Sequence, residues 1–150
     1  PLKIIRDDLK MTLVESTGKK CVFLTTVVEA LELKNVEVVN ARAEELGKKE
    51  EYRERFDCVI ARAVAPLSSL AEYCMPLIRK GGSFIAWKGS VDEVENARHA
   101  LTLLGGGKTQ SIGYELPSGY GARTLVVTKK QQNTPEKYPR GRGQERKNPL

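Results

Sequence analysis

The sequence lacks the residue patterns of two common kinds of site. Its three cysteines, Cys21, Cys58 and Cys74, are widely spaced and form neither a CxxC pair nor a Cys/His ligand pattern, so no metal site is expected. They are expected to be small buried residues of a protein in a reducing compartment. The one histidine, His99, falls on the polar side of a predicted helix, which argues against a catalytic role.

Long apolar runs and a signal-peptide pattern are also missing. No stretch approaches the length that a membrane-spanning helix needs, and these 150 residues show no signal-peptide pattern. These absences favour a cytoplasmic protein. The 150 residues match one domain of ordinary size, which buries a core without disulfides.

Positive charge is concentrated at the end of the chain. The net charge is +6, and residues 129–150 contribute +5 of it through seven cations and two glutamates. From residue 131 onward the sequence is polar and proline-rich without periodicity. Residues 131–150 are therefore predicted to be a basic, flexible arm that binds RNA phosphates.

Residues 1–130 show strands that alternate with helices. Apolar runs predict strands at residues 11–15, 36–39, 56–61 and 83–87, and helical spacing or propensity predicts helices at 17–33, 43–55, 67–77 and 91–104. Gly81-Gly82 is predicted to be a turn. Two further strands, 109–116 and 124–128, are joined by a link too short for a parallel crossover. The pattern predicts an α/β fold with a mostly parallel, doubly wound sheet and a C-terminal antiparallel strand pair.

The strand at residues 56–61 organises this prediction. Its apolar run from Cys58 to Ala61 is too short for a helix and predicts a strand covered on both faces. Ligands of parallel sheets bind beyond the carboxyl ends of the strands. Arg62, which directly follows the run, is therefore placed at the mouth of a site.

Four further residues are candidates for the site. Glu15 ends a predicted strand and suits the two ribose hydroxyls of an adenosine ligand, although a helix-capping role fits it equally well. Lys88, beside Gly89, suits a phosphate or is an ordinary loop lysine. Glu44 is also explained by its place in the first turn of a helix. Arg123 near the hairpin could equally be a solubilising charge.

Several segments together resemble a known family. They are Glu15-Ser16, Lys19-Lys20, Ala43-Glu44, ARAVAPL at 61–67, Lys88-Gly89, RTLVV at 123–127 and TPEKYPR at 134–140. In this order and spacing they closely resemble the bacterial 16S rRNA guanine-N7 methyltransferase G family, also called glucose-inhibited division protein B. The resemblance covers essentially the whole chain, and the ARAVAPL and TPxKYPR segments are its specific parts.

The resemblance implies a Rossmann-like class I methyltransferase that uses S-adenosyl-L-methionine (SAM). Its implied substrate is one guanine of 16S rRNA, as naked RNA or in the small-subunit particle. Neither a membrane nor DNA is an expected partner, and a monomer is the expected state.

The resemblance also implies roles for individual residues. Glu15, Ser16 and Thr17 match the segment near the cofactor ribose, where the family more often has Asp than Glu. Ala43 and Glu44 match the pair beside the adenine, and Arg62 matches the arginine near the methionine end. Lys88 and Arg123 match catalytic basic positions that face the RNA or its target base. No metal is implied.

One departure from the family stands out. Its glycine-rich loop and the preceding strand would come before Pro1, so residues 1–130 are expected to be a partial methyltransferase domain. That strand would lie between the strands at 11–15 and 56–61, and each unpaired buried backbone group costs about 1–3 kcal/mol. These 150 residues alone are therefore expected to be unstable and inactive.

Two alternatives remain open from the residues. A non-catalytic rRNA-binding or ribosome-assembly module would use the basic arm and keep the sheet as a scaffold. A nicotinamide-dependent dehydrogenase would use Glu15 at its own ribose, but the antiparallel end and the lack of a catalytic histidine or tyrosine arrangement argue against it. Equilibrium dialysis with SAM and with the nicotinamide cofactor separates the three functions.

Overall fold

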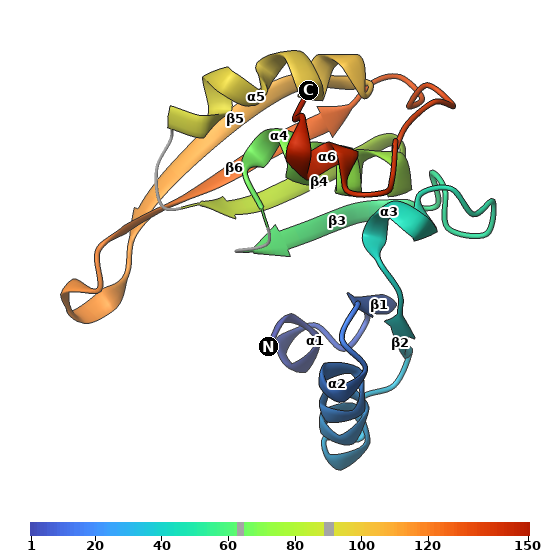
Figure 1. The fold of residues 1–150 in the computed structure, drawn as a ribbon. Helices are drawn as coiled ribbons and strands as arrows, with labels where there is room; N and C mark the ends of the chain where they lie inside the picture. Colours follow the sequence, from blue (N-terminus) through green and yellow to red (C-terminus); the bar gives the residue numbers. More distant parts are fainter. Residues whose placement is uncertain (63–64, 89–91) are drawn as a thin grey trace. The chain divides into compact units, whose positions relative to one another are not determined.

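The computed structural model describes residues 1–62, 65–88 and 92–150 (Figure 1). The chain divides into two compact units, Pro1–Ala43 and Glu44–Leu150. This division differs from the expected boundary at residue 130, because residues 131–150 belong to the second unit.

The first unit contains one parallel strand pair with a helix between the strands. Its elements are α1 (Leu2–Ile5), β1 (Met11–Glu15), α2 (Gly18–Ala30) and β2 (Val36–Asn40). β1 and β2 run parallel, with Glu15 opposite Asn40. The predicted β-α-β order of this part is confirmed.

The second unit is built on a four-stranded sheet with the order β3-β4-β6-β5. β3 and β4 are parallel, whereas β4 with β6 and β6 with β5 are antiparallel. This confirms the predicted antiparallel ending. The elements of this unit are α3 (Ala43–Leu46), β3 (Phe56–Arg62), α4 (Leu67–Cys74), η1 (Met75–Leu77), β4 (Ile78–Lys88), α5 (Asp92–Leu103), β5 (Gly106–Glu115), η2 (Pro117–Gly119), β6 (Ala122–Lys130) and α6 (Gln144–Lys147). The first residue of α3, Ala43, is the last residue of the first unit.

The core of the second unit lies between α4, α5 and the sheet. α4 starts directly after Pro66, as predicted, because the ring of Pro66 suits a helix start. Apolar residues at helical spacing put one face of α4 into the core, where it meets one face of α5 and the middle strands. The fully buried members include Leu67, Leu70 and Ala71 from α4, Phe84 and Ala86 from β4, Ala97, Ala100 and Leu101 from α5, and Val126 from β6.

β3 is not covered on both faces, contrary to the prediction. Val59 and Ala61 pack against the core, but Cys58 is exposed and Ile60 is 41% exposed. β3 comes first in the strand order, so within the described residues it has one strand partner, and the helices cover one of its faces. For the same reason Cys58 is exposed, whereas the expected burial of the other two cysteines is confirmed.

Two predicted boundaries are also wrong. The helix expected over 43–55 ends at Leu46, and the chain then turns so that the Arg53 guanidinium donates to nearby backbone carbonyls. The expected turn at Gly81-Gly82 is part of β4, at an irregularity of the β3–β4 register. A Cβ atom at Gly82 would lie 2.7 Å from the carbonyl oxygen of Asp57, so glycine allows this close approach.

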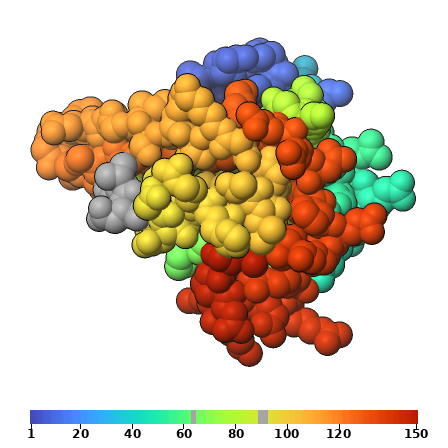
Figure 2. Space-filling model, turned by 90° about the horizontal axis from the view of Figure 1, so that it is seen from above, coloured from blue at the N-terminus to red at the C-terminus, as the bar shows by residue number. Residues whose placement is uncertain are grey.

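Residues 131–150, named here the C-terminal segment, are packed against the second unit rather than extended as a flexible arm. Thr134, Tyr138 and Glu145 are buried, and the segment lies beside α5 on the surface (Figure 2). Arg53 holds it by donating from Nη1 to the Tyr138 carbonyl at 2.8 Å and from Nη2 to the Thr134 carbonyl at 2.7 Å. Composition suggested disorder, but these contacts fix the backbone.

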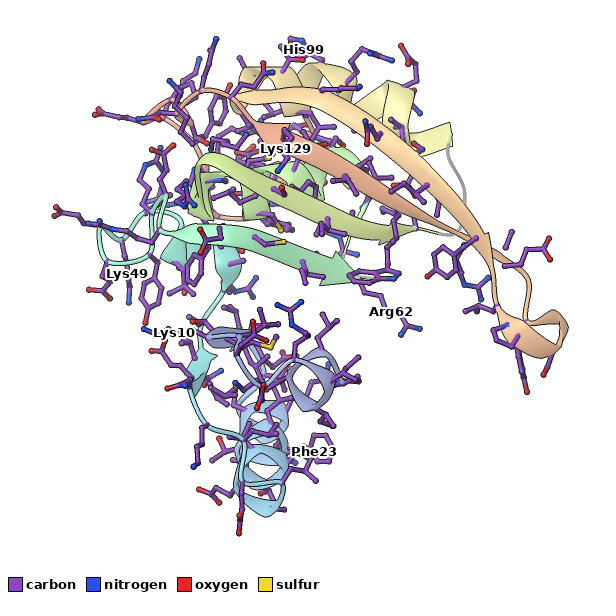
Figure 3. All side chains as sticks on the ribbon, turned by 180° about the vertical axis from the view of Figure 1, so that it is seen from behind. Lys10, Phe23, Lys49, Arg62, His99 and Lys129 are labelled. Carbon is purple, nitrogen blue, oxygen red and sulfur yellow. The ribbon has the colours of Figure 1, made fainter. Side chains whose placement is uncertain are left out.

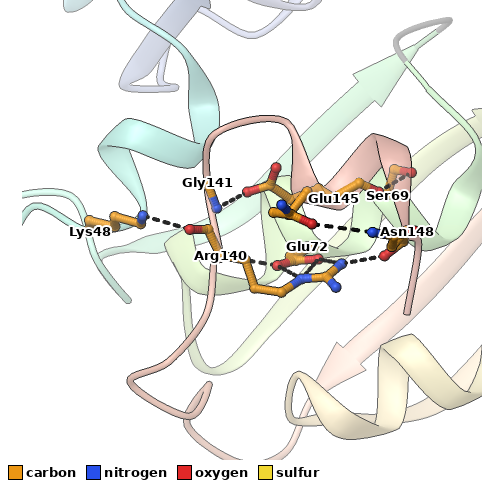
Figure 4. Close-up of polar contacts among 8 residues, drawn as sticks. Lys48, Ser69, Glu72, Arg140, Gly141, Glu145 and Asn148 are labelled. Carbon is orange, nitrogen blue, oxygen red and sulfur yellow. Dashed lines mark hydrogen bonds and ion pairs between the residues drawn. The ribbon is translucent and has the colours of Figure 1, made fainter.

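A partly buried ion pair joins the C-terminal segment to α4 (Figure 4). Glu72 is fully buried, and Arg140 binds it through Nε at 2.9 Å and Nη2 at 2.7 Å. The backbone N–H of Arg140 also donates to Glu72 at 2.8 Å. Nearby, Ser69 Oγ donates to the Glu145 carbonyl, and the Glu145 carboxylate accepts from the Gly141 N–H. Part of the charge that the sequence assigns to RNA is therefore used inside the protein.

Candidate functional site

Three predicted cations lie at one edge of the four-stranded sheet. Arg62 at the end of β3 is opposite Trp87 of β4, so Lys88 follows one residue further along the same edge. β6 begins at this edge, because its Thr124 is opposite Lys88, and Arg123 is the residue before Thr124. The carboxyl ends of the parallel strands and the start of the antiparallel strand thus place Arg62, Lys88 and Arg123 at the same edge. Side chains alternate along a strand, so Lys88 lies on the face that α4 and α5 cover, whereas Arg62 and Arg123 lie on the other face.

Arg62 is the most accessible of the three. Its side chain is exposed and extends beyond the end of β3 (Figure 3). Within the described residues it makes no hydrogen bond or ion pair, so its guanidinium donors are available to an anionic or carbonyl group of a ligand.

Lys88 is held inside the protein. Its Nζ donates to the Ala65 carbonyl at 2.8 Å and lies 2.7 Å from Glu93 Oε2, and its side chain is only 11% exposed. Glu93 Oε2 also accepts from the backbone N–H of Leu67 at 2.8 Å, at the start of α4. The desolvation of Glu93 would raise its pKa, but the hydrogen bonds from Lys88 and Leu67 outweigh that effect, so the pKa lies below its ordinary value and the group is ionised at neutral pH.

Arg123 is half-buried, and one N–H of its guanidinium is used by a backbone carbonyl of the same strand. Its Nη1 donates to the Ala122 carbonyl at 2.7 Å. In the antiparallel pair it lies opposite Tyr114 of β5. The other guanidinium donors remain for a ligand at the same edge as Lys88.

Glu15 ends β1 in the first unit. Its Oε1 accepts from the Thr17 N–H at 2.8 Å, and its Oε2 is 3.9 Å from Lys20 Nζ. The hydrogen bond from the Thr17 backbone is the main cause that lowers the pKa of Glu15. Its carboxylate is therefore ionised and keeps acceptor capacity for hydroxyl groups, since each carboxylate oxygen accepts more than one hydrogen bond.

The remaining predicted cofactor residues lie in both units. Ser16 and Thr17 are exposed beside Glu15, and Ala43 ends the first unit, whereas Glu44 starts the second in the short helix α3. Their convergence with Arg62 on one site stays a prediction. Gly89, Val91 and the Ala63-Val64 part of the ARAVAPL motif lie outside the described residues.

The described ranges contain no group of three or more His, Cys, Asp or Glu residues that could hold a metal ion. His99 is exposed on α5 (Figure 3), away from the strand ends. In the same ranges no helix has both the length and the apolar character for a membrane crossing.

Sequence reasoning missed Glu93. An acidic residue in the first turn of a helix is explained by the helix dipole alone, so nothing in the pattern linked Glu93 to Lys88. It also missed the internal roles of Arg53 and Arg140, because their partners are distant in sequence. The repeated basic residues around TPEKYPR gave no signal that separates an inward cation from an outward one.

Two of the solved structures with a similar arrangement are rRNA methyltransferases. A 16S rRNA N2 methyltransferase from T. thermophilus, solved with AdoMet and guanosine, aligns with a TM-score of 0.58 and 13% identity over 88% of this chain and 32% of that one. An rRNA methylase from Streptococcus thermophilus aligns with a TM-score of 0.56 and 16% identity over 82% and 74%. At these identities the likeness concerns the fold, and it confirms the predicted Rossmann-like methyltransferase fold.

Curated relatives match along the whole chain. The ribosomal RNA small subunit methyltransferase G of Lactobacillus acidophilus is 47% identical over 100% of this chain and 63% of its own length, and that of Staphylococcus saprophyticus is 49% identical over the same shares. The chain thus spans about 63% of the length of these relatives. The family described as GidB, rRNA small subunit methyltransferase G, matches residues 1–114, and the resemblance seen in the sequence is thereby confirmed: the chain belongs to this family.

Proposed function

We propose that the protein transfers a methyl group from SAM to N7 of a guanine in 16S rRNA. The observation that carries the proposal is the set of three cations, Arg62, Lys88 and Arg123, at the carboxyl edge of a methyltransferase sheet in a chain of this family. Three cations at one edge suit an anionic RNA substrate and the carboxylate of the cofactor. The relatives' names specify small-subunit rRNA, and the choice of N7 belongs to the proposal.

The residues present fit the cofactor. Glu15 is ionised and exposes 25% of its side chain, so it can accept from the two ribose hydroxyls while Thr17 keeps it oriented. Arg62, with no partner among the described residues, can bind the carboxylate of the methionine end. When bound, SAM supplies a methyl group on a positively charged sulfur.

The reaction requires the protein to position the two reactants, and it requires no proton transfer. Guanine N7 has a free lone pair and no proton, so no general base is needed, and the exposed His99 is not used. The protein's own tasks are to align the two reactants and to exclude water. Because the product base gains positive charge, the cations bind phosphates or the guanine O6 rather than N7 itself. The target guanine is unpaired or drawn out of its stack.

The cofactor role of Glu15 is testable by substitution. Glu15→Gln is expected to weaken SAM binding by about 10- to 100-fold, because hydrogen bonds to a charged group are worth about 1.5–3 kcal/mol. Glu15→Asp, the residue more common in the family, is expected to keep most of the affinity. Equilibrium dialysis measures both, with Glu29→Gln on the exposed side of α2 as the matched control. Unchanged affinity in Glu15→Gln would remove Glu15 from the site.

The contribution of the C-terminal segment to RNA binding is testable through salt dependence. Deletion of the segment would also remove its internal contacts, so charge-only changes are needed. Arg142, Arg146 and Lys147 are exposed, and their joint replacement by Gln is expected to flatten the plot of log K against log salt concentration by about 0.7 for each phosphate that is no longer neutralised. SAM affinity should not change.

The control for that measurement uses cations at the opposite edge of the sheet. Lys80 near the start of β4 and Lys108 near the start of β5 are both exposed and lie far along their strands from Lys88. Their replacement by Gln should leave the slope as it is. If the C-terminal variant also keeps the wild-type slope, the segment has no part in RNA binding.

The partners follow from the same chemistry. The expected substrate is 16S rRNA, free or in the small-subunit particle, and neither DNA nor a membrane is proposed as a ligand. The protein would act as a monomer in the cytoplasm, where its three unpaired cysteines stay reduced.

A further inference from the structure

Lys88 differs from an ordinary surface lysine in the number of N–H donors that its ammonium group can offer to a ligand. An ammonium group has three N–H donors, and two of them are directed at the Ala65 carbonyl and at Glu93 Oε2. Among the described residues the third donor has no partner, and it belongs to a side chain that is 11% exposed. The contacts come from two sides, since Ala65 precedes α4 and Glu93 lies in the first turn of α5.

Glu93 is the residue that links these elements. The same oxygen, Oε2, receives the Lys88 ammonium and the backbone N–H of Leu67, both within 2.8 Å. It therefore fixes the end of β4 relative to the start of α4. It also neutralises the Lys88 charge locally, which reduces the attraction of Lys88 for phosphates in general.

We propose that Glu93 is a positioning residue that holds Lys88 so that its one remaining N–H donates to a single oxygen of the bound RNA nucleotide. This inference rests on the proposed function, because it takes the edge with Arg62, Lys88 and Arg123 as the RNA site. It divides the work among the cations at this edge. Exposed Arg62 supplies charge for the carboxylate of the cofactor, whereas Lys88 supplies one hydrogen bond to the RNA in a fixed direction.

The decisive variant is Glu93→Gln. The amide oxygen of Gln can still accept from Leu67, so the start of α4 keeps its hydrogen bond, but the negative charge is removed. We expect kcat for methyl transfer to fall by about 10-fold or more, because a reactant held by a freely moving lysine is less well aligned. We expect the salt dependence of RNA binding to become steeper by about 0.7, because Lys88 now acts as an unneutralised cation.

A double-mutant cycle separates positioning from a merely structural role. In a Lys88→Gln background, Glu93→Gln should cause no further loss of kcat, because Glu93 acts through Lys88. Glu93→Asp, which keeps the charge, should restore part of the loss. Glu95→Gln is the matched control, since Glu95 is exposed on the same helix and pairs with Arg98 instead.

These experiments distinguish a failure of the inference about Glu93 from a failure of the proposed function. If the wild-type protein transfers no methyl group to rRNA, the proposed function fails, and the salt dependence of RNA binding still tests Glu93. A wild-type salt slope in Glu93→Gln overturns the inference, and so does an equal loss of kcat with and without Lys88. If Lys88→Gln itself leaves kcat unchanged while wild-type transfer is intact, the inference alone is wrong.

Discussion

Arg140→Met is expected to lower the free energy of unfolding by about 3 kcal/mol, the lower end of the cost of removing one partner of a buried ion pair, because the Glu72 side chain is buried but that of Arg140 is 27% exposed. The substitution leaves the Glu72 carboxylate, which is fully buried, with the Arg140 backbone N–H as its remaining donor from this residue. Uncompensated charge in the interior is costly because it has neither water nor a counter-ion around it. Urea unfolding of wild type and variant measures the difference.

Two comparisons make this result specific. Arg142→Met removes an exposed cation two residues away and should change the free energy of unfolding by less than about 0.5 kcal/mol. The double replacement of Glu72 and Arg140 by Met should cost less than Arg140→Met alone, because no buried charge is left. A loss below about 1 kcal/mol in Arg140→Met would show that the pair is open to water.

The second large effect concerns Lys130, whose side chain is buried. Desolvation lowers the pKa of Lys130 from 10.5 to about 8, although Glu54 at 3.5 Å acts in the opposite direction. Its Nζ donates to the Met75 carbonyl and to Thr134 Oγ1. Between these pH values the unfolded chain keeps a proton that the folded protein has released. The Lys130 contribution to the free energy of unfolding is therefore expected to rise, by on the order of 3 kcal/mol, as the pH goes from 8 to 10.5.

The measurement needs a variant that lacks the titrating group. Burial raises the pKa of Cys74 to about 12, so its linkage runs the other way: the unfolded thiol releases its proton near pH 9 and the folded one does not. Lys130→Met leaves the titration of Cys74 in place. The free energy of unfolding is measured against pH for the wild type and for Lys130→Met, and the difference between the two curves is the contribution of Lys130. Curves that stay parallel from pH 8 to 10.5 would contradict the prediction.

Local patterns predicted the regular elements of the fold well. The apolar spacing of Leu67, Leu70 and Ala71 fixes which face of α4 enters the core, and the short link at 117–121 allows only antiparallel neighbours. The common edge of Arg62 and Lys88 also followed from sequence, because carboxyl ends of adjacent parallel strands lie together.

Interactions between distant residues could not be predicted. Arg53 and Tyr138 are 85 positions apart, and Glu72 and Arg140 are 68 apart. A segment with few apolar residues and many charges has the composition of a disordered arm. The C-terminal segment is ordered only because residues distant in sequence bind it. The same limit applies to Lys88, because its position indicated an open cation for a phosphate, whereas its ammonium group is paired with Glu93.

The docked C-terminal segment has a consequence for biosynthesis. A ribosome releases the chain from its N-terminus, so Arg53 and Glu72 emerge long before the residues that satisfy them. Until Tyr138 and Arg140 have left the exit tunnel, the guanidinium of Arg53 and the carboxylate of Glu72 must stay hydrated. The contacts that hold the C-terminal segment therefore form only after Tyr138 and Arg140 have emerged.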